Sequence, residues 1–160
     1  MTAAGIPVDM GGDDLYVNTI YWGSTAPNQL NQVGPVGLAF NLEDVNFNAT
    51  NTDNAVTITL PGNIERYSIN SIRLNNASAS ISTATVGVFT GAGGTGQTIA
   101  ANQAITVTSA ATDTNNNTQS LTLTNGNTEA YNDATLYVRV GTAQGTAATA
   151  DVVVIINLLS

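Results

Sequence analysis

The sequence predicts an all-β protein: an antiparallel β-sandwich of jelly-roll-like kind with an irregular N-terminal extension. From residue 55 onward, apolar and polar residues alternate, which is typical of strands that bury one face. Gly, Pro and Asn separate the alternating runs, as the turns of a sandwich require. A length of 160 residues suits one domain. We therefore expect an N-terminal arm over residues 1–54 and a sandwich domain over residues 55–160.

The first expected strands lie between residues 56 and 74. The run over 56–60 alternates apolar residues with threonine and ends at Pro61-Gly62-Asn63. In the next run, 67–74, the apolar positions change parity halfway, which predicts a bulge near Asn70-Ser71. The pattern continues in three pairs, and Asn125-Gly126 is a hairpin signal; the pairs are Val86 and Val88, Ile105 and Val107, and Leu121 and Leu123.

The last two expected strands have the clearest pattern. Apolar residues alternate over 136–140, whereas the run over 152–158 is apolar on both faces. In that final run, Val153 and Ile155 point away from the face that carries the other apolar residues. A strand of this kind is either central in a sandwich or part of an intersubunit contact, and both alternatives remain open here.

The first third of the chain is punctuated by Gly, Pro and Asn, and its only expected strand is a short one over 14–22. It nevertheless carries large aromatic side chains. Groups of this size predict docking rather than free coil, either as a cap on the core of the same chain or on another chain. The candidate partner-binding residues are Tyr16, Tyr21, Trp22, Phe40 and Phe47, together with Val153 and Ile155.

Charge excludes several kinds of partner. Eleven carboxylates face three arginines, with no Lys or His, for a net charge of −8. Nucleic acids need a basic track that replaces their counterions, and anionic membranes attract basic segments. We therefore expect no nucleic acid and no membrane among the partners. No secretory signal and no run of about 20 apolar residues is evident, so synthesis is expected in the cytoplasm.

The residue inventory also excludes common catalytic and metal sites. Without His, Cys or Lys, a serine nucleophile lacks its usual base and zinc lacks its usual nitrogen and sulfur ligands. Adjacent carboxylates such as Glu43-Asp44 point to opposite faces of a strand, so they do not form the facing pair of a glycosidase. We expect no enzyme activity, no catalytic residue, no metal and no cofactor.

Two short motifs have simpler interpretations than a ligand site. Gly91–Gly96 matches the dinucleotide pattern GxGxxG, but the motif requires a following helix, and residues 97–107 alternate like a strand. A hairpin loop is expected instead. Asp113, Asn115 and Asn117 have the spacing that opens a calcium loop, but Thr118 and Thr124 replace its glycine and glutamate. This segment is expected to be an Asn-rich turn.

Two stretches resemble a known family. The first runs from Asn75-Asn76-Ala77-Ser78 through Val88-Phe89-Thr90 and 98–104 to Thr108-Ser109-Ala110, and the second comprises Ala134-Thr135-Leu136-Tyr137 with 142–152. Together, over roughly residues 56–158, they are similar to a small β-sandwich of tailed-bacteriophage virion proteins of the head decoration or cement type, encoded near the major capsid protein. Residues 1–54 match nothing in this family, which leaves the mode of attachment open.

The resemblance implies a structural role without catalytic residues. The expected partner is the major capsid protein of the same phage, the expected location is the capsid exterior, and the expected assembly is a homotrimer at local threefold positions. The alternative is a fibre or tail-tip module that recognises a host surface glycan. A carboxylate-based glycosidase and a minor tail-assembly component are further alternatives.

Overall fold

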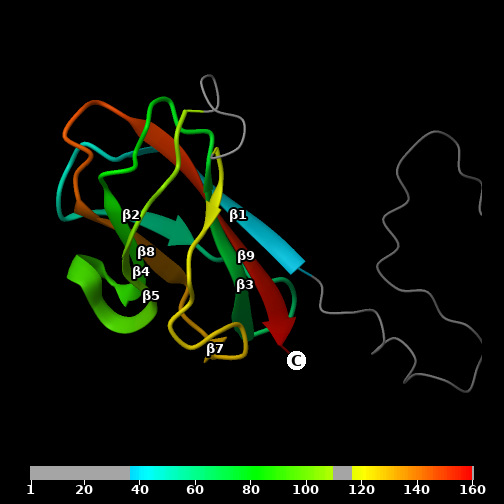
Figure 1. Ribbon diagram of the computed structural model, residues 1–160. Helices are drawn as coiled ribbons and strands as arrows, with labels where there is room; N and C mark the ends of the chain where they lie inside the picture. The colour runs from blue at the N-terminus through cyan, green and yellow to red at the C-terminus, as the bar shows by residue number, and fades with distance from the viewer. Residues whose placement is uncertain (1–36, 110–116, 160) are drawn as a thin grey trace, which may run out of the picture. The chain divides into compact units, whose positions relative to one another are not determined.

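The computed structural model describes residues 37–109 and 117–159. In this part of the chain, two antiparallel sheets pack face to face, which confirms the predicted all-β sandwich (Figure 1). All described strands belong to one compact unit. None of the described residues forms a helix that is long and apolar enough to cross a membrane.

The first sheet is built around the last strand of the chain. Its order is β1-β9-β3-β6, and β7 also pairs with β3. Its strands are β1 (Gly37–Asn46), β9 (Thr149–Leu159), β3 (Arg66–Asn75), β6 (Gln119–Ser120) and β7 (Ala130–Tyr131). In Figure 1, β1, β9 and β3 are labelled on the right side of the sandwich. Because β9 lies between β1 and β3, it forms ladder hydrogen bonds along both of its edges.

The second sheet has the order β2-β8-β4-β5. Its strands are β2 (Thr52–Thr57), β8 (Thr135–Thr142), β4 (Thr85–Gly91) and β5 (Thr95–Ala104), and the short 3₁₀ turn η2 (Ala92–Gly94) joins the last two. Here β8 is central, paired with β2 on one side and with β4 on the other.

The core lies between the sheets and is made of the inward residues of their strands. The two central strands, β9 and β8, contribute three completely buried residues each: Val152, Val154 and Ile156, and Leu136, Val138 and Val140. Burying a side chain of this size stabilises the fold by about 1.5–3 kcal/mol. The alternation predicted for both strands is therefore confirmed.

A bulge interrupts β3 at the predicted place. The register against β9 shifts between Ile69 and Ser71, so the apolar residues on both sides of the bulge point into the core. Near the start of β3, the Tyr67 ring is completely buried beside Tyr131, with ring centroids 6.0 Å apart. Its hydroxyl donates a 2.8 Å hydrogen bond to the Asp133 carbonyl. Burial, and then the nearby Asp133 carboxylate, raise the pKa of Tyr67.

The sandwich begins earlier than the predicted boundary at residue 55. β1 and the first half of β2 lie within the segment that was expected to be an irregular arm. The alternation over 38–42 is masked by neighbouring Gly and Asn, and its side chains are only partly buried because β1 is an edge strand. Inside the domain, Ile105, Val107 and Leu121 are buried as expected but lie just outside the strands.

Candidate interaction surface

The outer face of the first sheet carries the exposed side of β9. Val153 and Ile155 are partly exposed there and do not belong to the buried core. The register places Ala39 and Ser71 on either side of Ile155, and Asn41 and Arg73 on either side of Val153. We call these six residues the β9 outer face: Ala39, Asn41, Ser71, Arg73, Val153 and Ile155.

The position of β9 explains why its outward residues are apolar. Both neighbouring strands shield Val153 and Ile155 from the sides, so each side chain exposes only part of its surface. The predicted central placement of this strand is therefore confirmed. The contact alternative also stays a prediction, because the second sheet packs on the opposite side of β9.

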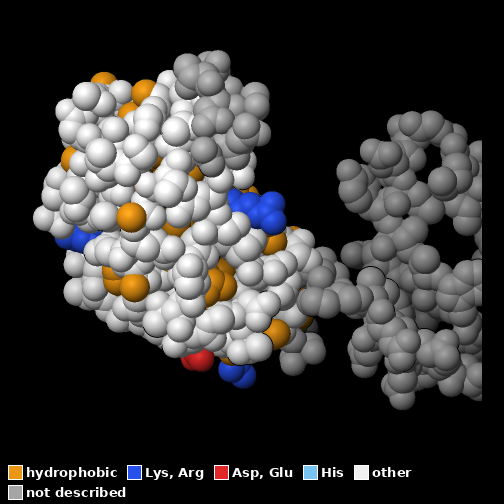
Figure 2. Space-filling model, viewed as in Figure 1, with side chains coloured by type: hydrophobic (Ala, Val, Ile, Leu, Met, Phe, Trp, Pro, Cys, Tyr) orange, Lys and Arg blue, Asp and Glu red, His pale blue; other side chains and the backbone are white. Residues whose placement is uncertain are grey.

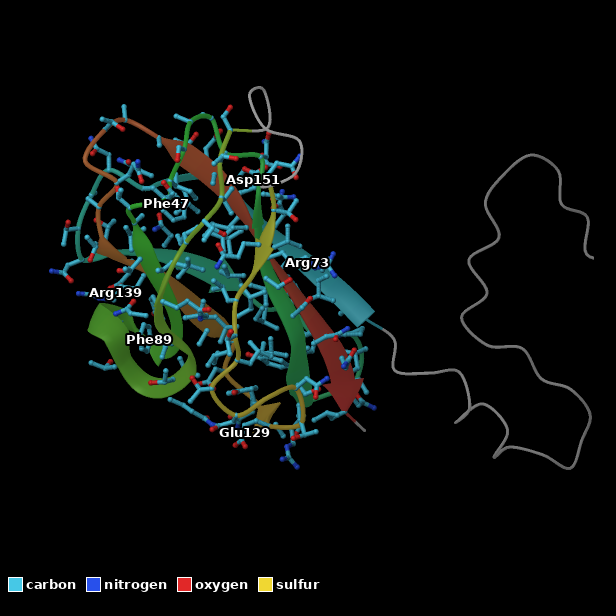
Figure 3. The ribbon with its side chains drawn as sticks, in the orientation of Figure 1. Phe47, Arg73, Phe89, Glu129, Arg139 and Asp151 are labelled. Atoms are coloured by element: carbon cyan, nitrogen blue, oxygen red, sulfur yellow. The ribbon has the colours of Figure 1, made fainter. Side chains whose placement is uncertain are left out.

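The β9 outer face is weakly charged. Arg73 is its only charged member, and none of the described ion pairs involves that arginine. Figure 3 shows Arg73 beside β1 and β9. In Figure 2 the visible side of the sandwich is mostly uncharged, with a few separate apolar spots. A face with few charges loses little solvation free energy when a partner covers it.

The two predicted contact residues in the described first third have different positions. Phe47 has 0 % of its surface exposed and belongs to the core. Its N–H donates to the Ala148 carbonyl (2.9 Å), and its carbonyl accepts from the Gln144 N–H (2.7 Å). A side chain without exposed surface cannot contact a partner. Phe47 therefore belongs to the core of its own chain, which was one of the two expected alternatives, and is not a partner-binding residue. Phe40 lies on the inner side of β1, opposite Val154, and is partly buried.

The remaining three predicted contact residues, Tyr16, Tyr21 and Trp22, lie outside the described residues, as do Asp113 and Asn115 of the expected Asn-rich turn.

The loop that matches GxGxxG is a hairpin turn held by a carboxylate. Gly93 and Gly94 have positive φ angles of 74° and 76°, a conformation that glycine adopts without strain. The Asp53 carboxylate accepts the Gly93 N–H (2.6 Å) through one oxygen and the Arg139 guanidinium (2.9 Å) through the other. Arg139 also donates to the Asn51 side-chain oxygen at 2.9 Å. The Gly93 N–H is therefore already occupied by a carboxylate. Because β4 and β5 pair antiparallel on either side of this loop, the expected hairpin loop is confirmed.

The same contacts set the charge state of Asp53. Partial burial raises the pKa of Asp53, but the Gly93 N–H and then the Arg139 guanidinium lower it by more, so the net shift is downward. The carboxylate is ionised at neutral pH and paired, with 21 % of its side chain exposed. Its geometry fixes the β4–β5 loop onto β2 and β8, which is a structural role.

On the outer face of the second sheet, two side chains lie close to glycines of the strands. Phe89 is only 7 % exposed although it does not join the main core, and Figure 3 shows it with Arg139 beside the β4–β5 loop. A Cβ at Gly87 would come within 2.9 Å of the Phe89 ring and 2.7 Å of the Asn102 side-chain oxygen. Asn102 also lies 3.0 Å from where a Cβ of Gly141 would be. Glycines in two adjacent strands thus let these side chains lie flat on the sheet.

Sequence reasoning missed Asp53, Arg139, Phe89 and Asn102. A signal was present, since Gly87 and Gly141 each interrupt an alternating run, and a glycine inside a strand often marks a close approach by another group. The identity of the approaching residue depends on the strand order, which the sequence does not specify.

Another group of polar side chains stabilises the bulge of β1. Asp44 has a positive φ of 53°, and its N–H donates to one oxygen of Asp151 at 3.0 Å. The other oxygen accepts the Asn76 side-chain amide at 2.9 Å. The Thr149 hydroxyl contacts Asp44 at 3.4 Å. The carboxylates of this cluster thus accept hydrogen bonds from one backbone N–H and from two side chains. Among the described residues no group of three or more potential metal ligands occurs.

The chain was compared with family models, curated proteins and solved structures, and none of them matches it.

Proposed function

We propose that this protein is a non-catalytic structural component of a tailed-bacteriophage particle. It binds the outer surface of the capsid and bridges neighbouring shell subunits, with the major capsid protein as its partner. The observation that supports the proposal most is the contrast between the two outer faces of the sandwich. On the outer face of the second sheet, the Phe89 ring is only 7 % exposed and lies close to Gly87, whereas the β9 outer face presents the partly exposed Val153 and Ile155 with a single charge.

A bridging protein stabilises a shell through linkage. It binds the assembled lattice and not the dissociated subunits, so each bound copy shifts the equilibrium toward the lattice. Threefold positions of the shell favour a homotrimer, whose three contacts act together as a multivalent attachment. The net charge of −8 favours solubility before assembly and disfavours a location against packed nucleic acid.

The first test is the copy number of the chain in purified virions, relative to the major shell protein, by quantitative mass spectrometry. A number close to that of the shell subunit supports a lattice-wide cement role. A small fraction of it contradicts that role and favours the fibre or tail-tip alternative, which a glycan array then tests. Absence from the virion rejects the proposal.

The second test locates the contact. Ile155→Thr keeps a β-branched residue on β9 but removes apolar surface from the β9 outer face. Its matched control is Ala55→Thr, an exposed position on β2. Both variants are added to capsids that lack the protein. We expect weaker binding by Ile155→Thr alone, with circular dichroism showing that both variants stay folded. Equal binding by the two variants rejects this face as the capsid contact.

A further inference from the structure

β1 has a long and regular free edge. Among the described residues, β1 pairs only with β9, so one edge of this ten-residue strand has ladder donors and acceptors without a strand partner. The register is regular over Gly37–Leu42, and the first shift comes between Leu42 and Val45. The edge strand β2 is regular over the same number of residues, Thr52–Thr57, but it includes the charged Asp53, and the pairing of β5 with β4 shifts register three times. Long regular edges are the ones that add another strand.

The side chains of β1 leave apolar surface at this edge. Leu38, Phe40 and Leu42 point to the inner side of the sheet and are only partly buried. On the outer side, Ala39 and Asn41 are exposed, small and uncharged. A strand added at the edge of β1 would cover the inner row and complete the backbone ladder.

We propose that this edge pairs with β1 of a second copy of the chain, antiparallel, across a twofold axis that passes through Phe40. In this register Phe40 faces Phe40 of the second copy, and Leu38 faces Leu42. Ala39 then faces Asn41. In this register every inward side chain faces an inward side chain. A shift by one residue would instead set apolar positions against polar ones. A shift by two residues keeps the faces but shortens the regular ladder.

The distribution of charge favours the same arrangement. Glu43, at the end of the regular segment, faces Gly37 of the second copy in the antiparallel register. The two Glu43 side chains are then six residues apart along the ladder, about 20 Å, which exceeds the Debye length of about 8 Å at physiological salt. A parallel pairing would set the two carboxylates side by side. The isologous contact is therefore self-complementary in shape and free of like-charge pairs.

This inference goes beyond the capsid role and does not depend on it. The twofold contact uses the backbone edge of β1, whereas the proposed capsid contact centres on Val153 and Ile155 of β9; Ala39 and Asn41 belong to both surfaces. A trimer formed through another surface is compatible with it, and the twofold contact would then connect one trimer to the next.

Cysteine pairing tests the register directly, because the natural chain has no Cys. Ala39→Cys and Asn41→Cys are made as two separate full-length variants, at exposed positions, and mixed under mild oxidation. Directly opposite residues have Cα atoms about 4.5–5.5 Å apart, within the range that a disulfide bridges. We expect the mixed dimer, identified by its mass, to exceed either self-linked dimer. Thr57→Cys, exposed on the edge of β2, is the control and should stay at the background level.

The strength of association gives an independent readout. Sedimentation equilibrium of the unmodified chain should show a dimer that tightens with added salt, since two copies of charge −8 repel each other. Gly37→Lys should tighten the dimer and Gly37→Glu should weaken it, by about 2- to 30-fold in Kd over two contacts. The position accepts a side chain, because an added Cβ meets nothing closer than 3.6 Å.

Three outcomes would overturn the inference. The first is a chain that stays monomeric with slow hydrogen exchange at every β1 amide, which would mean that another part of the same chain covers the edge. The second is a monomer with fast exchange at alternate β1 amides, which would mean that the edge stays open. The third is mixed-dimer formation no greater than that of Thr57→Cys, or a Kd that ignores the charge at position 37.

Discussion

Two adjacent isoleucines on β9 allow a matched measurement of what each side of the first sheet contacts. Ile156 is 0 % exposed and faces the core, whereas Ile155 faces outward and is partly exposed. Changing isoleucine to alanine removes about three carbon groups, or about 2.4 kcal/mol of transfer free energy when burial is complete. At position 156 an enclosed cavity adds to this, so Ile156→Ala should lower the free energy of unfolding by about 3–5 kcal/mol.

At position 155 solvent reaches the vacated space, so Ile155→Ala should cost about 1–1.5 kcal/mol. Urea unfolding of both variants and of the unmodified chain, at one fixed protein concentration, measures the difference, and the m value should not change. An equal cost at the two positions would refute the reasoning. It would mean that a further layer covers the β9 outer face, and that this face is not free to contact a capsid.

Three further predictions concern the polar and glycine contacts. Gly87→Ala should destabilise the protein by about 1–3 kcal/mol, because the added methyl would overlap the amide oxygen that lies 2.7 Å away, while Gly37→Ala, where the nearest atom to the added Cβ would be 3.6 Å away, should be close to neutral in the same thermal unfolding assay. Tyr67→Phe should cost about 1 kcal/mol through the lost hydroxyl hydrogen bond; an unchanged midpoint in urea would contradict that contact. Asp53→Asn should destabilise the protein at neutral pH, and its deficit should disappear on acidification. The folded pKa of Asp53 lies below 3.8, so the stability it gains from Arg139 is complete above that value and is lost as the pH falls through the folded pKa. A deficit that persists at pH 2 in urea titrations would contradict this linkage.

The strands that could be predicted from the sequence are those that have a neighbouring strand on both sides. In β8 the alternation reports burial directly, in β9 the continuous apolar run indicated a central strand, and the parity change in β3 revealed the bulge at Ile69 and Ser71. The edge strand β1 was missed because its inner side chains are only partly buried. Its alternating run, 38–42, is short and lies between Gly37 and the charged pair Glu43-Asp44, so it was not recognised as a strand.

The candidate surface was predictable only in part. A strand that is apolar on both faces correctly marked β9 as central, but nothing in the sequence said that Phe47 would close the core. Its backbone is held by hydrogen bonds to residues about a hundred positions away, Ala148 and Gln144, a contact that the local sequence does not reveal. The pairing of Asp53 with Arg139 likewise arises from the β2–β8 register, which is a property of the strand order.

The position of β9 also determines when the protein can fold. β1 and β3 do not pair with each other; β9 joins them, and the other partners of β3 are only the two-residue strands β6 and β7. A ribosome makes both of them long before it reaches residue 149, so the first sheet has no centre during most of translation. Strand pairing over such sequence distances is slow, and strands that wait unpaired are prone to aggregate. A chain that is cut before β9 should therefore yield no smaller sandwich but an unfolded product, and correct folding in the cell depends on completing synthesis of this strand.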